Sequence, residues 1–112
     1  MTTADLVARG REIVVTEREA LNRVAANIDE AFARAVRVLK RATGKVIVTG
    51  VGKSGIIAQK MAATLNSTGT PAFYLHPADA LHGDLGMARR DDAMVIFSKS
   101  GETDELARLL PA

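Results

Sequence analysis

The sequence predicts an α/β fold, a three-layer doubly wound parallel sheet of the flavodoxin-like kind preceded by a helical segment. Three short apolar runs alternate with helical patterns over residues 44–112, and parallel strands joined by helices are the usual result of that alternation. Doubly wound domains normally have more than three strands. We therefore expect the sheet to be incomplete within this chain and to be completed by further sequence or by another chain.

The helical lead is assigned to residues 1–43 because apolar residues recur there three or four positions apart. We expect one helix over Thr3–Val15, with Gly10 as a weak point, and an amphipathic helix over Glu17–Arg41, with Gly44 as the residue that stops it from continuing. These helices carry no recognisable chemistry. Their apolar stripe is expected to pack on a core or on another subunit, which suits the interface of a dimer or tetramer.

The second part of the chain, residues 44–112, is predicted to form the sheet. The β-branched run "KVIVTG" is bounded by glycines and is typical of a strand that is buried on both faces. The segment Pro77–Met87 is expected to be a loop with one helical turn. The other expected elements are strands over Pro71–His76 and Ala93–Ser98 and helices over Ser54–Leu65 and Gly101–Leu110. The first of these helices is expected to bury Ile56, Ile57, Met61 and Leu65.

Composition and charge narrow the possible classes of function. The 112 residues are 47% hydrophobic and 25% charged, which is ordinary for one globular core. The formal net charge is +2 and basic residues are interspersed with acidic ones, so no nucleic-acid-binding surface is indicated. The lack of cysteine excludes disulfides and thiolate metal sites, and no apolar run is long enough to span a membrane. Without a secretory signal pattern, the protein is expected to be cytoplasmic.

The loop after the first predicted strand has the spacing G-x-G-x-x-G at Gly50, Gly52 and Gly55. A P-loop is excluded because Ile47 stands where that pattern requires its first glycine. A dinucleotide-binding loop fits the spacing, but the second strand ends in Tyr-Leu-His-Pro, without the acidic residue that would bind the ribose. The alternative is that the glycines only permit a tight strand-to-helix turn. The spacing alone leaves both interpretations open.

A second loop, "SKSGET", follows the third predicted strand. Parallel topology places this serine loop and the glycine loop at the same carboxyl edge of the sheet. The hydroxyl groups of Ser98, Ser100 and Thr103, together with free amides near Gly101, suit a compact phosphate monoester. Helix capping is the structural alternative, but it accounts for one serine rather than three hydroxyl groups.

The motifs "GKVIVTGVGKSG", "QKMAATLNSTGTPAFYLHPADALHGDLGM" and "SKSGETDE" resemble the sugar isomerase (SIS) domains that bind phosphosugars, and within them the arabinose 5-phosphate isomerases. The "ALHGDLGM" segment discriminates, because the serine loop recurs among SIS domains of many functions. The resemblance implies interconversion of D-arabinose 5-phosphate and D-ribulose 5-phosphate through a cis-enediolate, a step that supplies the sugar acid Kdo of the Gram-negative outer membrane. Further catalytic residues of the family are expected beyond the end of this chain.

The resemblance also implies roles for individual residues. Lys53 would be the cation beside the enediolate and Glu105 a catalytic carboxylate. Substrate contacts are implied for Gly52, Ser54, Gly69, Thr70, His82, Ser98, Ser100, Gly101 and Thr103. His76 would bind a divalent metal such as zinc in an inhibitory or regulatory contact, and no cofactor is required. Lys99 replaces the small polar residue that is usual in the family and adds positive charge near the phosphate.

Two alternatives to an isomerase remain open from the sequence. One is a non-catalytic SIS module that binds phosphosugars as a sensor, which would keep the serine loop without needing Lys53 and Glu105. The other is a degenerate fragment that only associates with other subunits. The presence of both residues and of the "HGDLG" segment favours the enzyme lineage.

Overall fold

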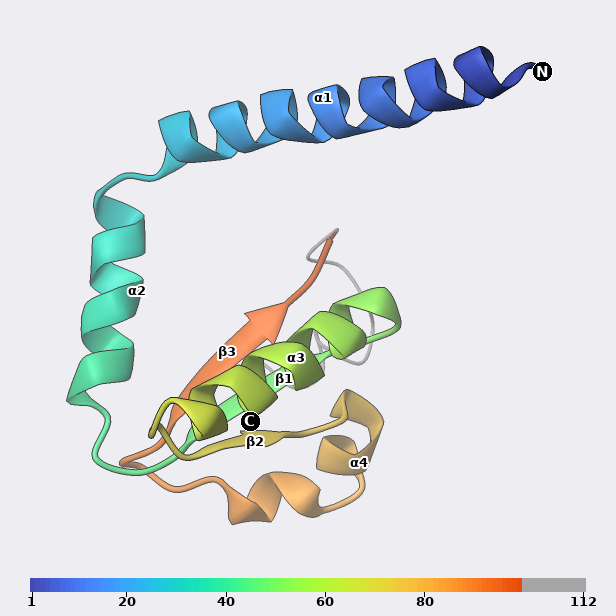
Figure 1. Ribbon diagram of the computed structural model, residues 1–112. Coiled ribbons are helices and arrows are strands. Elements are labelled where there is room, and N and C mark those ends of the chain that lie inside the picture. The colour runs from blue at the N-terminus through green and yellow to red at the C-terminus, as the bar shows by residue number, and fades with distance from the viewer. Residues whose placement is uncertain (100–112) are drawn as a thin grey trace. The chain divides into compact units, whose positions relative to one another are not determined.

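The computed structural model describes residues 1–99, which belong to two compact units (Figure 1). The first unit comprises Met1–Arg37 and the second begins at Val38. The predicted boundary, after residue 43, falls near the start of the second unit. No helix in the described part of the chain is long and apolar enough to cross a membrane.

Helix α1 (Thr3–Asn27) begins at a capping box. The Asp5 backbone N–H donates to the Thr2 hydroxyl at 3.1 Å, and the Thr2 N–H donates to the Asp5 carboxylate at 2.8 Å. The hydrogen bond from the Thr2 backbone is the main reason that the pKa of Asp5 lies below its usual value, and the hydrogen bond with the Thr2 side chain lowers it further. None of the residues of α1 is buried by the described chain, so its apolar side chains face outward from this unit.

The predicted break near Thr16 is wrong, because α1 continues through it to Asn27 and α2 spans Glu30–Arg41. The Thr16 hydroxyl donates to the carbonyl oxygen of Glu12 at 2.9 Å, so this side chain is satisfied inside the helix. The break falls instead at Ile28, whose backbone is extended. The helical lead is confirmed as helical, but the break between its two helices lies later in the sequence than predicted.

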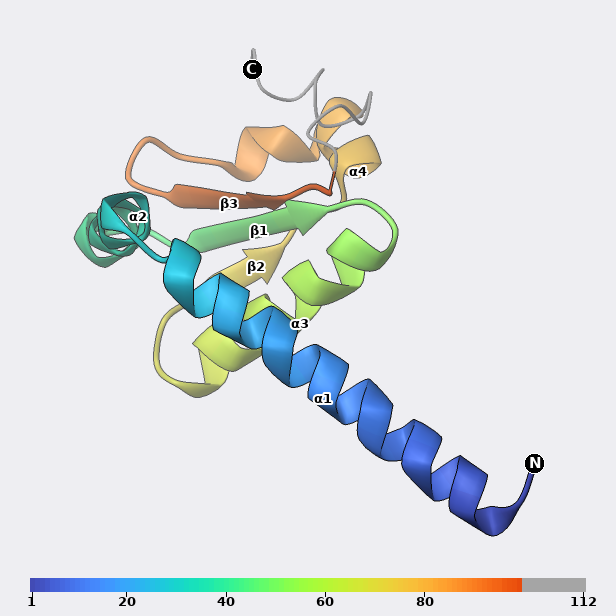
Figure 2. The same ribbon diagram turned by 90° about the horizontal axis from the view of Figure 1, so that it is seen from above.

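Three parallel strands, β1 (Val46–Gly50), β2 (Ala72–Tyr74) and β3 (Ala93–Phe97), form the sheet of the described chain in the order β2-β1-β3 (Figures 1 and 2). The predicted parallel α/β sheet is confirmed. Every residue of the central strand β1 is buried, as its β-branched run predicts. β2 is shorter than predicted because, after Leu75 donates to the Val48 carbonyl at 2.9 Å, the chain turns into the next helix.

Helix α3 (Lys53–Ser67) covers one face of the sheet through its small residues. Gly55, Ala58 and Ala62 are its buried positions, and the two alanines pack in one cluster with the side chains of β1 that point to this face. Figure 2 shows α3 on one side of the strands and α4 on the other. Small side chains let the helix axis approach the strand closely, which increases the packing contact of the whole helix.

The prediction that Ile56 and Ile57 lie on the buried face of this helix is wrong. They are 63% and 54% exposed, respectively. Met61 and Leu65 do pack against the core, as predicted. The helix is turned so that the positions with the smallest side chains meet β1, which places the bulky pair outward. Leu39, in the last turn of α2, packs against the same cluster.

The opposite face of the sheet is covered by α4 (Pro77–Leu81) and the 3-10 helix η1 (Asp84–Met87). Ile47, Leu75 and Ala80 form the buried cluster on this face, and Leu85, Met87 and Ala88 pack against it. The segment was predicted as a loop with one helical turn, and it contains two short helices instead. The helix predicted over Gly101–Leu110 lies outside the described residues.

Candidate functional site

The carboxyl ends of β1 and β3 lie side by side. Gly50, the last residue of β1, pairs in register with Phe97, the last residue of β3, so that Ser98 leaves the sheet beside the glycine loop. The sheet order means that the chain leaves β1 toward β2 on one side, whereas β3 lies on the other side. Ligands of open α/β sheets bind at such a switch point. The glycine loop and the start of the serine loop therefore share the edge where this class of fold binds its ligands.

The glycines of the first loop have two different structural roles. A Cβ on Gly50 would lie 2.8 Å from the backbone of Ser54, and a Cβ on Gly55 would lie 2.6 Å from the carbonyl oxygen of Gly50. These two glycines let α3 pack directly on the end of β1. Gly52 has a left-handed φ of 60°, and a Cβ there would meet nothing within 4 Å among the described residues. Gly52 is needed for its backbone conformation, and the space beside it is open.

Helix α3 begins in this loop. Gly52 is its N-cap residue and, because glycine has no side chain, makes no side-chain cap hydrogen bond. Lys53 is the first helical residue and is exposed, and the adjacent Ser54 is half-buried. A cation at a helix N-terminus is unfavourable for the helix dipole, whereas the free N–H groups of that terminus attract an anion. The position of Lys53 thus suits a lysine that acts on a negatively charged ligand.

Tyr74 supports the glycine loop and was not identified from the sequence. Its hydroxyl donates to the carbonyl oxygen of Gly50 at 3.2 Å, and it lies 2.9 Å from the place where a Cβ of Gly55 would be. The side chain comes from β2, where Tyr74 pairs in register with Val48. The sequence shows a tyrosine near the end of a predicted strand. Its contact with the glycine loop can be predicted only when it is known that this strand lies next to β1.

The two histidines lie on the segment that follows β2. His76 is the N-cap residue of α4, and its Nδ1 accepts a hydrogen bond from the Ala78 N–H at 3.1 Å. Because β2 is parallel to β1, His76 lies at the carboxyl edge of the sheet. His82 is the C-cap residue of the same short helix and is exposed. A contact between His82 and the sugar stays a prediction, and this placement is compatible with it.

The described residues around His76 do not form a zinc site. Zinc usually takes four ligands, of which at least three come from the protein. The Nδ1 atom of His76 already serves as a helix cap, and within residues 1–99 no group of three or more His, Cys, Asp or Glu side chains could hold a metal ion. The metal contact of His76 stays a prediction, and the site described here does not depend on it.

The remaining predicted site residues fall into two groups. Gly69 and Thr70 precede β2 and lie beside the start of β1, where the Val46 N–H donates to the Pro71 carbonyl at 2.9 Å. This is the amino edge of the sheet, so the length of α3 separates them from Lys53 within one chain (Figure 1). Their substrate contacts stay predictions. Ser100, Gly101, Thr103 and Glu105 lie outside the described residues.

Comparison with solved structures and curated proteins identifies relatives that cover most of this chain. A protein from Escherichia coli CFT073, solved in complex with arabinose 5-phosphate, matches 99% of this chain with a TM-score of 0.91 and 45% identity, over 59% of its own chain. Arabinose 5-phosphate isomerase GutQ of Escherichia coli K12 is 46% identical over 106 residues, or 95% of this chain. Arabinose 5-phosphate isomerase KdsD of Pseudomonas aeruginosa is 44% identical over 107 residues, or 96% of it.

The matched region is a part of each curated relative. It makes up 33% of both GutQ and KdsD, so the chain spans about a third of the length of the curated relatives it matches. The SIS domain matches residues 39–112, which include β1, α3, the "HGDLG" segment and the serine loop. The resemblance inferred from the sequence motifs is confirmed by these matches. This chain belongs to the SIS domain family.

Proposed function

We propose that this chain provides the phosphosugar-binding edge of an aldose-ketose isomerase that interconverts D-arabinose 5-phosphate and D-ribulose 5-phosphate. The observation that carries the proposal is the pairing of Gly50 with Phe97, which places the glycine loop and Ser98, the first residue of the serine loop, at the switch point of the sheet. The names of the curated relatives, and the sugar phosphate in the similar solved structure, support this substrate class. The product would then supply Kdo synthesis in the cytoplasm.

The reaction moves one proton between neighbouring carbon atoms. A base removes the proton from C2 of the aldose, and the electron pair forms the C1–C2 double bond of an enediolate while negative charge develops on O1. Proton transfer between the two oxygens and return of a proton to C1 then give the ketose. Such a reaction needs a base, a cation or hydrogen-bond donor for the developing oxyanion and a firm grip on the phosphate.

This chain offers a residue for each need. Lys53, exposed at the start of α3, is the cation for the enediolate oxygen. Ser98 follows β3 and, with the hydroxyl groups further along the serine loop, would bind the phosphate at the same edge. Glu105 is the base in this proposal and lies outside the described residues. The proposal therefore assigns charge stabilisation and phosphate binding to two loops that start from neighbouring strand ends, after Gly50 and after Phe97.

Deuterium exchange tests the proposal on the purified chain. Arabinose 5-phosphate is incubated with it in deuterium oxide, and proton NMR follows the C2 proton signal and the appearance of ribulose 5-phosphate. Exchange that is lost in Glu105→Gln, but kept in the matched variant Glu102→Gln, supports the isomerase. Loss of exchange in Lys53→Met, with Lys60→Met as the matched control for charge, supports the role of Lys53.

The same samples distinguish the second candidate function, a phosphosugar-binding module without catalysis. Its support is that the chain spans about a third of the length of its curated relatives, so most of each relative lies outside the matched region. If arabinose 5-phosphate shifts the amide NMR signals near Gly52 and Ser98 but its C2 proton does not exchange, the chain is such a binding module. No shift at either residue overturns both functions.

We also propose that the chain assembles with copies of itself through the helical lead. In its own unit α1 exposes large apolar side chains along its length, namely Leu6, Val7, Ile13, Val14, Leu21 and Val24. A helix with such a stripe is normally covered by another surface. A dimer or tetramer would provide that cover.

A further inference from the structure

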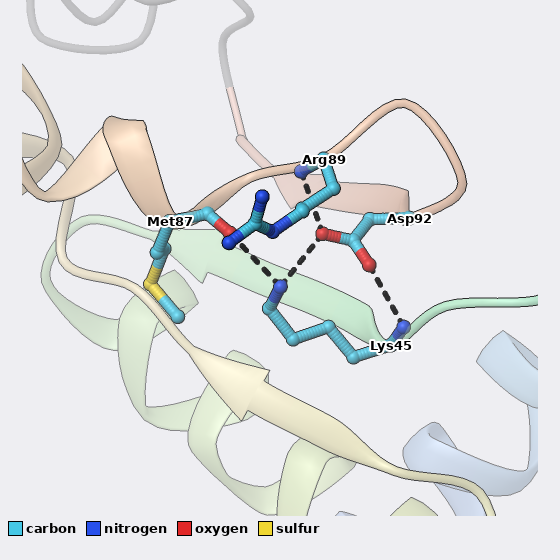
Figure 3. A network of polar contacts seen from close by, with 4 residues as sticks. All are labelled: Lys45, Met87, Arg89 and Asp92. Carbon is cyan, nitrogen blue, oxygen red and sulfur yellow. Dashed lines mark hydrogen bonds and ion pairs between the residues drawn. The ribbon is translucent and has the colours of Figure 1, made fainter.

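A polar network at the amino edge of the sheet ties three separate parts of the chain together (Figure 3). The Lys45 Nζ donates to the Asp92 Oδ2 at 2.7 Å and to the Met87 carbonyl oxygen at 3.0 Å. The Asp92 carboxylate also accepts from the Lys45 backbone N–H at 2.9 Å and from the Arg89 N–H at 2.8 Å. Lys45 precedes β1, Met87 ends η1 and Asp92 precedes β3.

The network is largely shielded from water. The Asp92 side chain is 6% exposed and the Lys45 side chain 27%. The hydrogen bond from the Lys45 side chain lowers the pKa of Asp92; partial burial acts in the opposite direction, and the N–H groups of Arg89 and Lys45 lower the pKa further. A Cβ on the neighbouring Gly44 would collide with the Asp92 carboxylate, so the backbone there is fitted to the network. These features distinguish it from an exposed ion pair, whose contribution is small.

The Lys45 side chain reaches the segment that carries His82. After α4, the chain passes through His82 and Gly83 into η1, where the Gly86 N–H donates to the Gly83 carbonyl at 3.0 Å. Leu85, Met87 and Ala88 attach this segment to the sheet by apolar contact. Apolar contact is not directional, whereas the hydrogen bond from Lys45 to Met87 fixes the end of η1 at a defined place.

We infer that Lys45 and Asp92 are positioning residues for the segment His82–Met87, and through it for contact of His82 with the sugar part of a phosphosugar. This inference rests on the proposed function and on the predicted contact of His82 with the sugar. The network lies at the opposite edge of the sheet from the glycine loop, so it acts through η1 and not on the ligand. Loss of the network should therefore weaken binding of the sugar part of the ligand. It should not weaken binding of the phosphate, which the serine loop is proposed to hold.

Amide hydrogen exchange of the purified chain tests the mechanical part. In Lys45→Met, exchange at Gly86 and Ala88 should become at least about tenfold faster, because one hydrogen bond to a charged group is lost beside them. Exchange at Leu75, whose N–H donates to the Val48 carbonyl, should not change. The matched control Lys60→Met removes the same charge from an exposed position of α3 and should leave all three amides unchanged. Equal acceleration of all three amides in Lys45→Met indicates general destabilisation and overturns the inference.

Ligand titration tests the functional part. Lys45→Met should bind arabinose 5-phosphate about fivefold more weakly, which corresponds to the loss of one neutral hydrogen bond, that between His82 and the sugar, while its affinity for inorganic phosphate stays that of the parent. Lys45→Arg, which keeps a cationic donor, should restore most of the affinity. Asp92→Asn keeps the shape of the side chain and should reproduce the effect if Lys45→Met does not fold.

The outcomes of the two proposals are distinguishable. A parent chain that does not bind arabinose 5-phosphate overturns the proposed function before any variant is compared. A parent chain that binds it, together with Lys45→Met and Asp92→Asn variants that bind it equally well, leaves the function standing and overturns the positioning role.

Discussion

Replacing Gly55 by alanine should destabilise the second unit, although alanine is the better helix former. The added Cβ would lie 2.6 Å from the Gly50 carbonyl oxygen and 2.9 Å from the Tyr74 hydroxyl, whereas ordinary contacts begin at 3.4 Å. Helix α3 would have to move by about 0.8 Å, the difference between 2.6 and 3.4 Å, relative to the end of β1. A backbone carbonyl in a central strand cannot turn away as a flexible side chain can.

The magnitude follows from two opposing terms. Overpacking a closely packed core typically costs about 1–3 kcal/mol, and we take the upper half of this range because the contact is with backbone. The higher helix propensity of alanine offsets about 1 kcal/mol of this destabilisation. The free energy of unfolding of Gly55→Ala should therefore be lower by about 1–2 kcal/mol, which corresponds to a urea midpoint about 0.5–1 M below that of the parent.

Urea unfolding followed by circular dichroism measures this difference. Gly86→Ala is the matched control, because a Cβ there meets nothing within 4 Å among the described residues and its φ is not in the left-handed region. Its midpoint should equal or slightly exceed that of the parent, since alanine reduces the conformational freedom of the unfolded chain. A Gly55→Ala midpoint at or above the parent value would refute the close contact between α3 and β1.

Three further predictions concern other parts of the molecule. The Thr49 hydroxyl is fully buried without a hydrogen-bond partner among the described residues, and an unpaired hydroxyl costs about 1–3 kcal/mol. Thr49→Val should therefore raise the free energy of unfolding, whereas Val48→Thr, at an equally buried position, should lower it in the same urea assay; a lower value in both would show that Thr49 has a partner. Because the pKa of Asp92 is lowered in the folded chain, its contribution to stability is complete above the usual 3.8 and is lost as the pH falls through the lowered value. Asp92→Asn should thus be less stable than the parent at neutral pH, with a difference that shrinks in acid unfolding experiments; a difference independent of pH contradicts the assignment. Leu21→Glu should shift sedimentation of the chain toward the monomer, whereas the charge-matched Asn22→Glu on the same helix should not if Leu21 lies in the interface, and equal behaviour of the two variants argues against it.

Local patterns predicted most of the fold because each strand is marked by residues close together in the sequence. The run Val46–Gly50 is β-branched, bounded by glycines and buried in full, so its pattern indicated both the strand and its central place. The buried face of α3 was mispredicted because hydrophobicity alone favours isoleucine over glycine and alanine. The distance between helix and strand decides that choice, and this distance is set by the glycines at positions 50 and 55.

Contacts between distant residues could not be predicted in the same way. Lys45 and Asp92 are 47 positions apart and neither belongs to a recognisable motif. Tyr74 reaches Gly50 only because β2 and β1 are neighbours in the sheet. For both contacts the sequence provides suitable residue types, and the strand order determines that they meet.

The glycine pattern itself shows why spacing was a weak guide to the ligand. Gly50 and Gly55 are required by the packing of α3 on β1, and this requirement exists whether or not a ligand binds. Of the three glycines in the pattern, only Gly52 has a left-handed backbone with open space beside it, so it is the one that a ligand could approach. A G-x-G-x-x-G pattern therefore reports mainly the geometry of a strand-to-helix junction. The class of ligand depends on the loop that starts beside this junction, and here the register of β1 and β3 places Ser98, the first residue of the serine loop, there.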